Sequence, residues 1–192
     1  MNRNNQVGIS LSEAVSKVAS AVREITVKVS GANGRRGSGT VWRSGLILTN
    51  AHVANSQVHE VDFGDGMRVP GWLIARDPEL DLAALAVSTP PRHFAAIRSA
   101  SELRTGEIVL AFGNPLDGRG SVTTGIVHHP VGKSVWLFAD IRLSPGNSGG
   151  PLAETSGSVV GINSMIVGPL GCAITSDAAD EFLRRFNLSE AA

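Results

Sequence analysis

The sequence has a single cysteine, no surplus of either charge and no long hydrophobic run. Because Cys172 is the only cysteine among 192 residues, no disulfide can form within the chain, and the fold must be held by packing. Cys172 lies in the apolar stretch 170–174, where we expect a small core residue rather than a reactive thiol. The 17 basic and 17 acidic residues give a net charge of +0, which disfavours nucleic acid or an anionic membrane as the main partner.

Neither a targeting segment nor a metal site stands out. Residues 1–6 are polar and lead into no signal-peptide core, and no apolar stretch reaches the ~18 residues that span a bilayer. We therefore expect no membrane insertion, and either a cytoplasmic protein or the mature form of an exported one. There is no H-E-x-x-H pattern and no cysteine-rich spacing, so we expect neither a metal nor another cofactor.

The composition is that of a globular protein, with 42% hydrophobic and 18% charged residues. A helix is predicted at residues 11–22, because Ser10 and Glu13 fit a capping box and apolar residues follow at helical spacing. A second helix is predicted at residues 176–186, where an apolar stripe follows two candidate caps, Ser176 and Asp177.

Between these helices, short runs rich in valine, isoleucine, leucine and threonine alternate with glycine, proline and aspartate turns, as is typical of β-rich domains. Strands are expected at residues 24–30, 37–43, 46–49, 57–63, 67–76 and 82–87, and then at 107–112, 121–128, 134–140, 158–167 and 170–175. Because closure removes exposed strand edges, we predict an all-β fold with short terminal helices and two six-stranded antiparallel β-barrels. The expected parts are an N-terminal segment and helix (1–23), a first barrel (24–98), a second barrel (99–176) and a C-terminal helix (177–192).

A serine surrounded by glycines, within the stretch 143–152 (LSPGNSGGPL), is the first candidate for chemistry. Glycine tolerates positive φ and allows a ligand to come close to the backbone. Such a loop can present the Ser148 hydroxyl while N–H groups converge on one point, which is the geometry of a nucleophile beside an oxyanion hole. The alternative is a plain glycine-rich turn, so a base and an acid must be found elsewhere in the chain.

Five histidines could supply the base, and none of them follows Ser148. The α/β-hydrolase order of serine, acid and histidine is therefore excluded, and the subtilisin order fails because no aspartate precedes His52. His52 comes after the apolar strand 46–49, which ends in a small polar stretch, and a rigid frame of this kind suits a base held in one position. His59 lies within a strand and is expected to be solvated.

Asp81 is the candidate acid, because it interrupts an otherwise apolar run that continues over residues 82–85. A buried carboxylate is costly unless it is paired or accepts several hydrogen bonds. By accepting the Nδ1–H of His52 it would gain a partner and leave Nε2 facing Ser148. The alternative is a turn or edge-strand aspartate, which is how we interpret Asp77.

Four segments in this order resemble the protease domain of the HtrA/Deg serine proteases, which are trypsin-like enzymes of the chymotrypsin fold. The segments are residues 37–41 (GSGTV), 46–53 (LILTNAHV), 81–85 (DLAAL) and 146–152 (GNSGGPL). Shorter matches lie at residues 113–115 (GNP), 122–127 (VTTGIV) and 161–163 (GIN). The resemblance runs from about Val15 to Phe186, and the 29 residues from histidine to aspartate argue against a chance match.

By this resemblance, His52 is a general base, Asp81 its orienting acid and Ser148 the nucleophile of a serine endopeptidase. Its substrates would be polypeptides, unfolded or misfolded proteins among them. The N–H groups of Gly146 and Ser148, with that of Asn147 alongside, would form the oxyanion hole. In this family the hole can collapse when the peptide before Asn147 flips.

The sequence also departs from the family pattern. HtrA proteins usually carry one or two PDZ domains after the protease domain, whereas this sequence stops at Ala192, so we expect a protease domain without a PDZ domain. The segment 30–37 is short, which leaves little room for a long regulatory loop. A homotrimer held by N-terminal segments is implied by the resemblance, and it would involve the helix at residues 11–22.

Residues just before Ser148 are expected to line the primary specificity pocket. Strand alternation places Leu143 on the pocket side and Arg142 on the opposite face, with two further apolar contributions from a facing strand, Ile162 and Met165. This arrangement predicts cleavage after small or medium aliphatic residues, with loose discrimination among them. A competing interpretation places the Arg142 guanidinium inside the pocket, where it would favour an acidic side chain.

A rival from another functional class is a latent peptide-binding or chaperone module that keeps the barrels and holds the catalytic site shut. The presence of all three triad residues argues against simple degeneration. Reaction of Ser148 with a fluorophosphonate probe would discriminate between the two.

Overall fold

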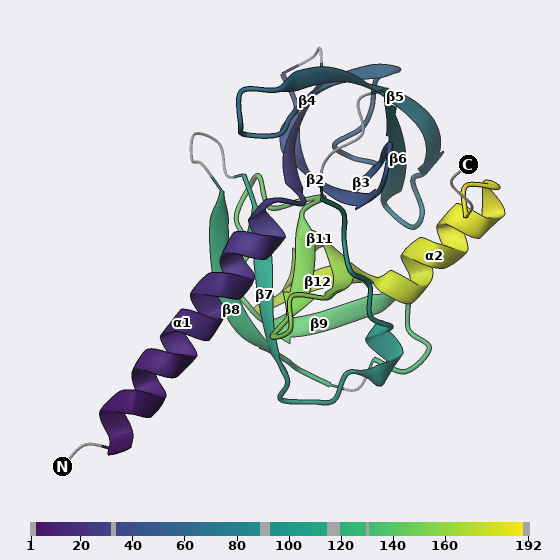
Figure 1. Ribbon diagram of the computed structural model, residues 1–192. Coiled ribbons are helices and arrows are strands. Elements are labelled where there is room, and N and C mark those ends of the chain that lie inside the picture. Colours follow the sequence, from purple (N-terminus) through teal and green to yellow (C-terminus); the bar gives the residue numbers. More distant parts are fainter. Residues whose placement is uncertain (1–2, 32–33, 89–92, 115–119, 130, 190–192) are drawn as a thin grey trace.

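The computed structural model (Figure 1) describes residues 3–31, 34–88, 93–114, 120–129 and 131–189. Residues 89–92 of the stretch between the two strand sets and Pro115 of the GNP motif lie outside these ranges. Within the described part, the expected fold class is confirmed: two closed barrels of six strands each, with a helix at either end of the chain.

The first barrel consists of β1 (Thr26–Gly31), β2 (Arg36–Arg43), β3 (Leu46–Thr49), β4 (Val58–Asp62), β5 (Arg68–Asp77) and β6 (Leu82–Val87). Its antiparallel strands are bonded in the order β1-β2-β3-β6-β5-β4. Along β4 and β5 the more buried side chains alternate with exposed ones, because successive residues of a strand point to opposite faces. All of β3 and most of β6 are buried, so the outer faces of these two strands are covered as well.

The second barrel consists of β7 (Ile108–Gly113), β8 (Ser121–Val127), β9 (Trp136–Asp140), β10 (Pro151–Glu154), β11 (Val159–Val167) and β12 (Leu170–Thr175), bonded in the order β10-β11-β12-β9-β8-β7. Strand β10 was not among the strands expected from the sequence. It is only four residues long and follows directly on the glycine-rich loop, so its local pattern resembles the end of that loop. Its partners β7 and β11 bury all four residues and make it a strand.

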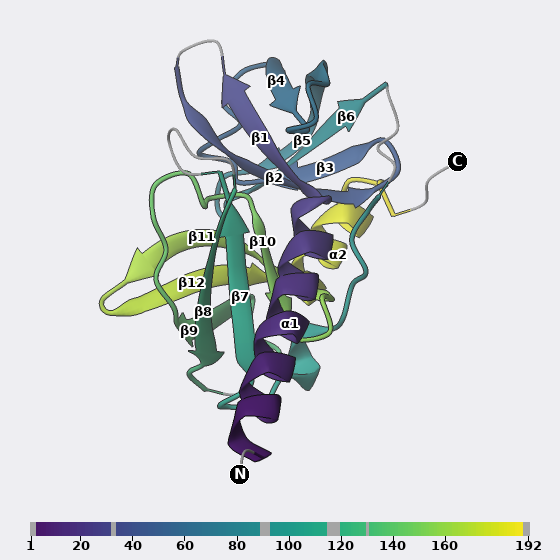
Figure 2. The same cartoon turned by 60° about the vertical axis from the view of Figure 1, so that its left-hand side comes forward.

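The N-terminal helix α1 spans Arg3–Arg23 and is longer than expected. The capping-box residues Ser10 and Glu13 lie within the helix, so the prediction that it begins there was wrong. In Figures 1 and 2 the helix runs along the second barrel, and its N-terminal end extends past the strands. Val22 is buried at its C-terminal end, and Val15 and Val18 pack against the core. No helix in the described ranges is both long and apolar enough to cross a membrane.

The C-terminal helix α2 spans Ser176–Arg185, and its N-cap is Thr175, whose hydroxyl accepts a hydrogen bond from the N–H of Ala178. The prediction that Ser176 or Asp177 caps it was wrong, because both side chains bind the segment that joins the barrels. The Ser176 hydroxyl donates to the carbonyl of Arg98 over 2.7 Å, and the Asp177 carboxylate accepts from the Ser99 hydroxyl over 2.6 Å.

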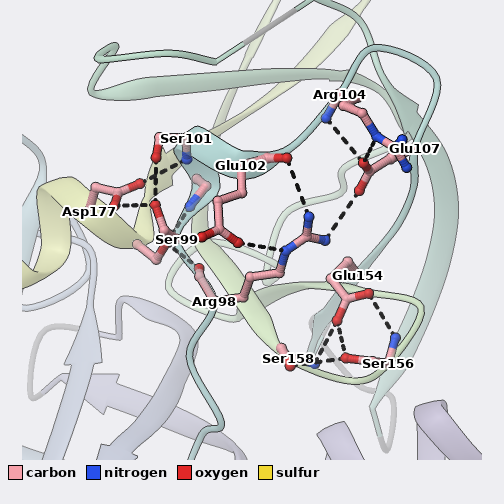
Figure 3. A network of polar contacts seen from close by, with 12 residues as sticks. Arg98, Ser99, Ser101, Glu102, Arg104, Glu107, Glu154, Ser156, Ser158 and Asp177 are labelled. Atoms are coloured by element: carbon pink, nitrogen blue, oxygen red, sulfur yellow. Dashed lines mark hydrogen bonds and ion pairs between the residues drawn. The ribbon is translucent and has the colours of Figure 1, made fainter.

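This joining segment contains a one-turn 3₁₀ helix, η1 (Ala100–Glu102), and is fixed by a polar network (Figure 3). Arg98 forms ion pairs with Glu102 and Glu107, at 3.5 Å and 3.2 Å. The network and the bonds from α2 hold residues 98–102 of the joining segment against α2 and the second barrel.

One apolar cluster extends through both barrels. It contains the interior of the first barrel, together with Phe112 and Ile162 from the second barrel and Phe182 from α2. A smaller cluster fills the rest of the second barrel. Cys172 is buried, as expected, and burial raises the pKa of its thiol to about 11.

Candidate active site

The three candidate catalytic residues lie in turns contributed by both barrels. His52 follows β3, and Asp81 directly precedes β6, the neighbour of β3 in the first barrel. The carbonyl of Asp81 accepts hydrogen bonds from the N–H of Ala51 over 3.1 Å and from the Asn50 side chain over 3.0 Å. Ser148 lies in the loop that connects β9 with β10 in the second barrel.

His52 and Asp81 form a close pair. Nδ1 of His52 lies 2.9 Å from both carboxylate oxygens of Asp81, and the backbone N–H of His52 donates to one of them over 3.1 Å. An ionised carboxylate only accepts hydrogen bonds, so Nδ1 carries the proton and Nε2 is left as an acceptor. The imidazole side chain is 48% exposed and the carboxylate side chain 13%, so the ring faces the solvent side of the pair.

The carboxylate of Asp81 is held in its charged form. Burial by itself raises the pKa of Asp81, but hydrogen bonds from His52 and Ser164 outweigh it, so that the pKa lies below its ordinary value. The Ser164 hydroxyl donates over 2.6 Å. Asp81 also has φ 57, in the left-handed region that non-glycine residues seldom adopt. Such strain is retained where the surroundings fix the conformation.

The hydroxyl of Ser148 donates to the backbone carbonyl of Ser164 over 3.1 Å. Within the described residues it forms no hydrogen bond with His52, so the nucleophile and base are not connected in this conformation. Side-chain torsions have staggered wells, and rotation of χ1 to another well re-aims the hydroxyl without moving the backbone.

The loop before Ser148 forms a tight turn. The N–H of Asn147 donates to the carbonyl of Ser144 over 2.9 Å, and Gly146 has φ 103. Proline at the second position and a positive-φ glycine at the third are what a type II turn requires. The N–H groups of Gly146 and Ser148 have no acceptor among the described residues. The N–H of Asn147 is used within the turn, so the expectation of a third donor alongside them does not fit this geometry.

The loop is packed tightly against the first barrel. Gly149 has φ 86, and a Cβ there would lie only 2.1 Å from the carbonyl oxygen of Ser38 and 2.3 Å from the hydroxyl of Thr49. The N–H of Ser38 donates to the carbonyl of Ser148 over 2.8 Å, and the Thr40 hydroxyl donates to the carbonyl of Gly149 over 3.1 Å. Strand β2 therefore holds the loop that carries the candidate nucleophile.

A cavity of about 140 Å³ adjoins Ser148, lined by Leu143, Ser144, Asn147, Ser148, Ser164, Met165 and Ile166. Leu143 and Met165 lie where the sequence places them. Ile162 does not line this cavity, because it is fully buried in the large apolar cluster. Strand β11 has an irregularity between Asn163 and Met165. Arg142 is exposed and is not among the lining residues.

The structure also corrects the interpretation of His59. This residue is 2% exposed, and neither ring nitrogen has a hydrogen-bond partner. Burial lowers the pKa of His59 below its ordinary value. His59 and Val61 are two residues apart in strand β4, so their side chains point to the same face, and Val61 is buried. This local pattern could have indicated that His59 faces inward. Among the described residues, no group of three or more histidine, cysteine, aspartate or glutamate side chains could hold a metal ion.

Comparison with known sequences gives one family and a set of relatives. Residues 37–162 match the family described as "Trypsin-like peptidase domain". A "Probable periplasmic serine endoprotease DegP-like" of Brucella suis is 36% identical over 146 residues, which cover 71% of this chain and 28% of the relative. The protein of the same name from Chlamydia pneumoniae is 32% identical over 71% of this chain and 30% of its own length.

A third relative has a different printed name. "Serine protease HTRA2, mitochondrial" of Drosophila ananassae is 34% identical over 164 residues, covering 78% of this chain and 38% of the relative. In all three cases the match covers well under half of the relative's length.

Proposed function

Because this chain belongs to the trypsin-like peptidase domain family, in its HtrA/Deg branch, we propose that it is a serine endopeptidase with His52, Asp81 and Ser148 as its catalytic residues. The observation that carries the proposal is the bonded pair of His52 and Asp81 in one barrel, which is linked to Ser148 of the other through Ser164. The N–H groups of Gly146 and Ser148, for which the described part of the chain provides no acceptor, support it, because a hydrolase of this type needs donors aimed at the developing oxyanion.

The mechanism is acyl transfer. The Ser148 hydroxyl turns from the Ser164 carbonyl towards Nε2 of His52, which removes the proton as the oxygen attacks the peptide carbonyl. The negative charge on the substrate oxygen is stabilised by the N–H groups of Gly146 and Ser148. His52 then gives the proton to the leaving amine, and water hydrolyses the acyl-enzyme by the same steps in reverse. Asp81 stays ionised throughout and holds the ring in the tautomer that the reaction needs.

Covalent labelling tests the proposal directly. A fluorophosphonate probe is expected to attach to Ser148 in the native chain and not in Ser148→Ala, with the site identified by peptide mass spectrometry. Ser148→Ala should keep its unfolding temperature, because a half-buried hydroxyl contributes little to stability. A native, folded chain that stays unlabelled and cleaves no unfolded protein would contradict the proposal.

The cavity beside Ser148 favours aliphatic residues before the cleaved bond. Leu143, Met165 and Ile166 supply apolar lining, and no charged side chain lines it. A cavity of about 150 Å³ in another protein holds benzene, so a volume of this size suits a valine or leucine side chain. Peptides that differ only in valine or glutamate at this position should show faster cleavage after valine. Faster cleavage after glutamate would favour the competing role of Arg142.

The latent peptide-binding module has one observation in its favour, the bond from the Ser148 hydroxyl to the carbonyl of Ser164. If this conformation persisted, Ser148 would remain unactivated and the cleft would only bind polypeptides. Time-resolved labelling separates the two: an active site reacts at once, whereas a latent one reacts only after an unfolded polypeptide is added. We favour the enzyme, because all three triad residues are present and rotation of χ1 re-aims the Ser148 hydroxyl without moving the backbone.

A homotrimer assembled through the N-terminal region is part of the proposal, by resemblance to the HtrA/Deg family. Helix α1 is the element to test, because its N-terminal end extends past the second barrel (Figure 2). Removal of residues 1–11 leaves Val15, Val18 and Val22 to pack on the core. Light scattering on this truncation is expected to show a loss of trimer, and an unchanged mass would remove α1 from the interface.

A further inference from the structure

The hydroxyl of Ser38 contacts the turn that would form the oxyanion hole. Ser38 lies in β2 of the first barrel, is 0% exposed, and donates to the carbonyl of Gly146 over 2.6 Å. The two residues are 108 positions apart in the sequence and belong to different barrels. No other hydrogen bond to this carbonyl is present among the described residues, so the Ser38 hydroxyl is what satisfies it.

The direction of this hydrogen bond is fixed by a second one. The backbone N–H of Asn114 donates to the Ser38 hydroxyl oxygen over 2.7 Å. Because that oxygen accepts from Asn114, its own proton is directed to the carbonyl of Gly146. The three groups form a chain from N–H to O–H to C=O, and such chains are mutually polarised.

The contacted carbonyl belongs to the peptide unit between Gly146 and Asn147. The other polar end of this unit, the N–H of Asn147, donates to the carbonyl of Ser144 over 2.9 Å. The unit is therefore held at both ends, and turning it over would break both hydrogen bonds. It joins the peptide that carries the Gly146 N–H to the peptide that carries the Ser148 N–H, so holding it in place helps to fix the two candidate oxyanion donors relative to each other.

We propose that Ser38 is a positioning residue, whose hydroxyl anchors the Gly146–Asn147 peptide and so keeps the turn in the conformation that presents the Gly146 and Ser148 N–H groups to the catalytic site. This inference rests on the proposed function and adds a named group that keeps the oxyanion hole open at rest. Ser38 does not touch the substrate and acts only through Gly146.

The backbone of Ser38 has separate contacts that a side-chain substitution leaves in place. Its N–H donates to the carbonyl of Ser148, and its carbonyl accepts from the Thr49 hydroxyl over 2.6 Å. Ser38→Ala therefore removes the hydroxyl while β2 stays bonded to the loop. Thr40→Val is the matched control, because it removes another buried hydroxyl of β2 that bonds the same loop, at the carbonyl of Gly149.

The test measures kcat and KM for a peptide with valine before the cleaved bond, and the rate of fluorophosphonate labelling. Ser38→Ala is expected to lower kcat and the labelling rate about tenfold, the factor that one ordinary hydrogen bond is worth, with KM within about twofold. Thr40→Val is expected to lower the unfolding temperature similarly, with kcat within about twofold of the native value. Equal kcat values in the two variants would overturn the proposal while leaving the protease function intact.

A second measurement decides the matter even if the native chain proves inactive. Amide hydrogen exchange of Asn147 reports the bond to Ser144, and it should be about tenfold faster in Ser38→Ala than in Thr40→Val. Equal exchange in the two variants would overturn the proposal. If Ser38→Ala does not fold, Ser38→Cys retains a side chain of similar shape with a weak donor, and the same differences from Thr40→Val are expected.

Discussion

The two barrels hold their parts of the candidate site in different ways. The first barrel supplies His52 and Asp81 from neighbouring turns that bond to each other through both backbone and side chains. The second barrel supplies Ser148 on a loop. The carbonyl groups of this loop accept hydrogen bonds from hydroxyl and N–H groups of the first barrel. The base and acid thus come from one barrel, with one further hydrogen bond from Ser164 of the other, whereas the geometry of the nucleophile depends mainly on how the two barrels are docked.

This contrast separates two kinds of failure. A substitution within the His52–Asp81 pair should remove chemistry and leave the fold intact. A substitution that forces the loop away from β2 should disturb stability and chemistry together. The following substitutions test the contrast in order of decreasing effect.

Asp81→Asn is expected to have the largest effect on turnover. The amide donates to Nδ1 of His52 and stabilises the wrong tautomer, so kcat should fall about 10⁴-fold, as it does in another protease with this triad. Steady-state hydrolysis of an aliphatic peptide measures the loss, and thermal unfolding checks that the variant is folded. A kcat within tenfold of the native value would show that the pair is not part of the reaction.

Gly149→Ala should disturb stability and chemistry together. The new Cβ overlaps the Ser38 carbonyl and the Thr49 hydroxyl, and φ 86 is strained for alanine, so we expect a loss of about 3 kcal/mol in the free energy of unfolding. Gly157→Ala is the control, because φ 92 is similar there but the nearest atom is 3.9 Å away. Urea unfolding compares the two variants. Similar losses in both would mean that backbone strain, not the contact between barrels, accounts for the effect.

His59→Leu tests a buried group in the first barrel that the mechanism does not use. Both ring nitrogens lack partners, so leucine should stabilise the fold by about 1 kcal/mol. Because burial lowers the pKa of His59 in the folded state, the unfolded chain binds a proton more readily than the folded one. The free energy of unfolding is therefore unaffected by this titration above pH 6.5, and it declines as the pH falls below that value. Unfolding measured at pH 7.5 and pH 5 should show a smaller decline in the variant. An equal decline in both chains would contradict this account.

Arg185→Gln should have the smallest effect. It tests whether the position of Asp81 depends on helix α2. Arg185 of α2 pairs with Asp77, whose carboxylate also accepts from the N–H groups of Glu79 and Leu80 in the turn before Asp81. The arginine side chain is 56% exposed, so the pair should contribute less than about 1 kcal/mol. We expect kcat within twofold of the native value. A larger fall in kcat would show that α2 helps to position Asp81.

Much of the fold was predictable because its signals are local. Alternating strands and turn residues indicated eleven of the twelve strands, and chain order left His52 as the base that fits a triad with Ser148. The exception, β10, becomes a strand through partners that are distant in sequence. The start of α1 was also missed, because Ser10 and Glu13 fit a cap pattern but the helical backbone continues through them.

The parts of the site that escaped prediction depend on contacts between distant segments. Ile162 was assigned to the specificity pocket as part of a facing strand, but it is buried in the apolar cluster that both barrels share, and Ile166 lines the cavity. The inward face of His59 could be inferred from Val61 two residues on, but the two glycines that make room for it on neighbouring strands, Gly31 and Gly71, are brought there by distant pairing. Nothing in the segment around Ser38 indicates its bond to Gly146, since the two meet only after both barrels have closed.

The apolar cluster that runs through both barrels has a consequence for folding. Since Phe112, Ile162 and Phe182 complete the same interior as the strands of the first barrel, the two barrels share a core, although the second barrel also has a smaller cluster of its own. We expect unfolding to be a single cooperative transition, with no intermediate in which one barrel survives alone. An enzyme of this kind would lose its activity in a single step when it is denatured. No partly folded intermediate would then be exposed to cleavage by enzyme molecules that are still active.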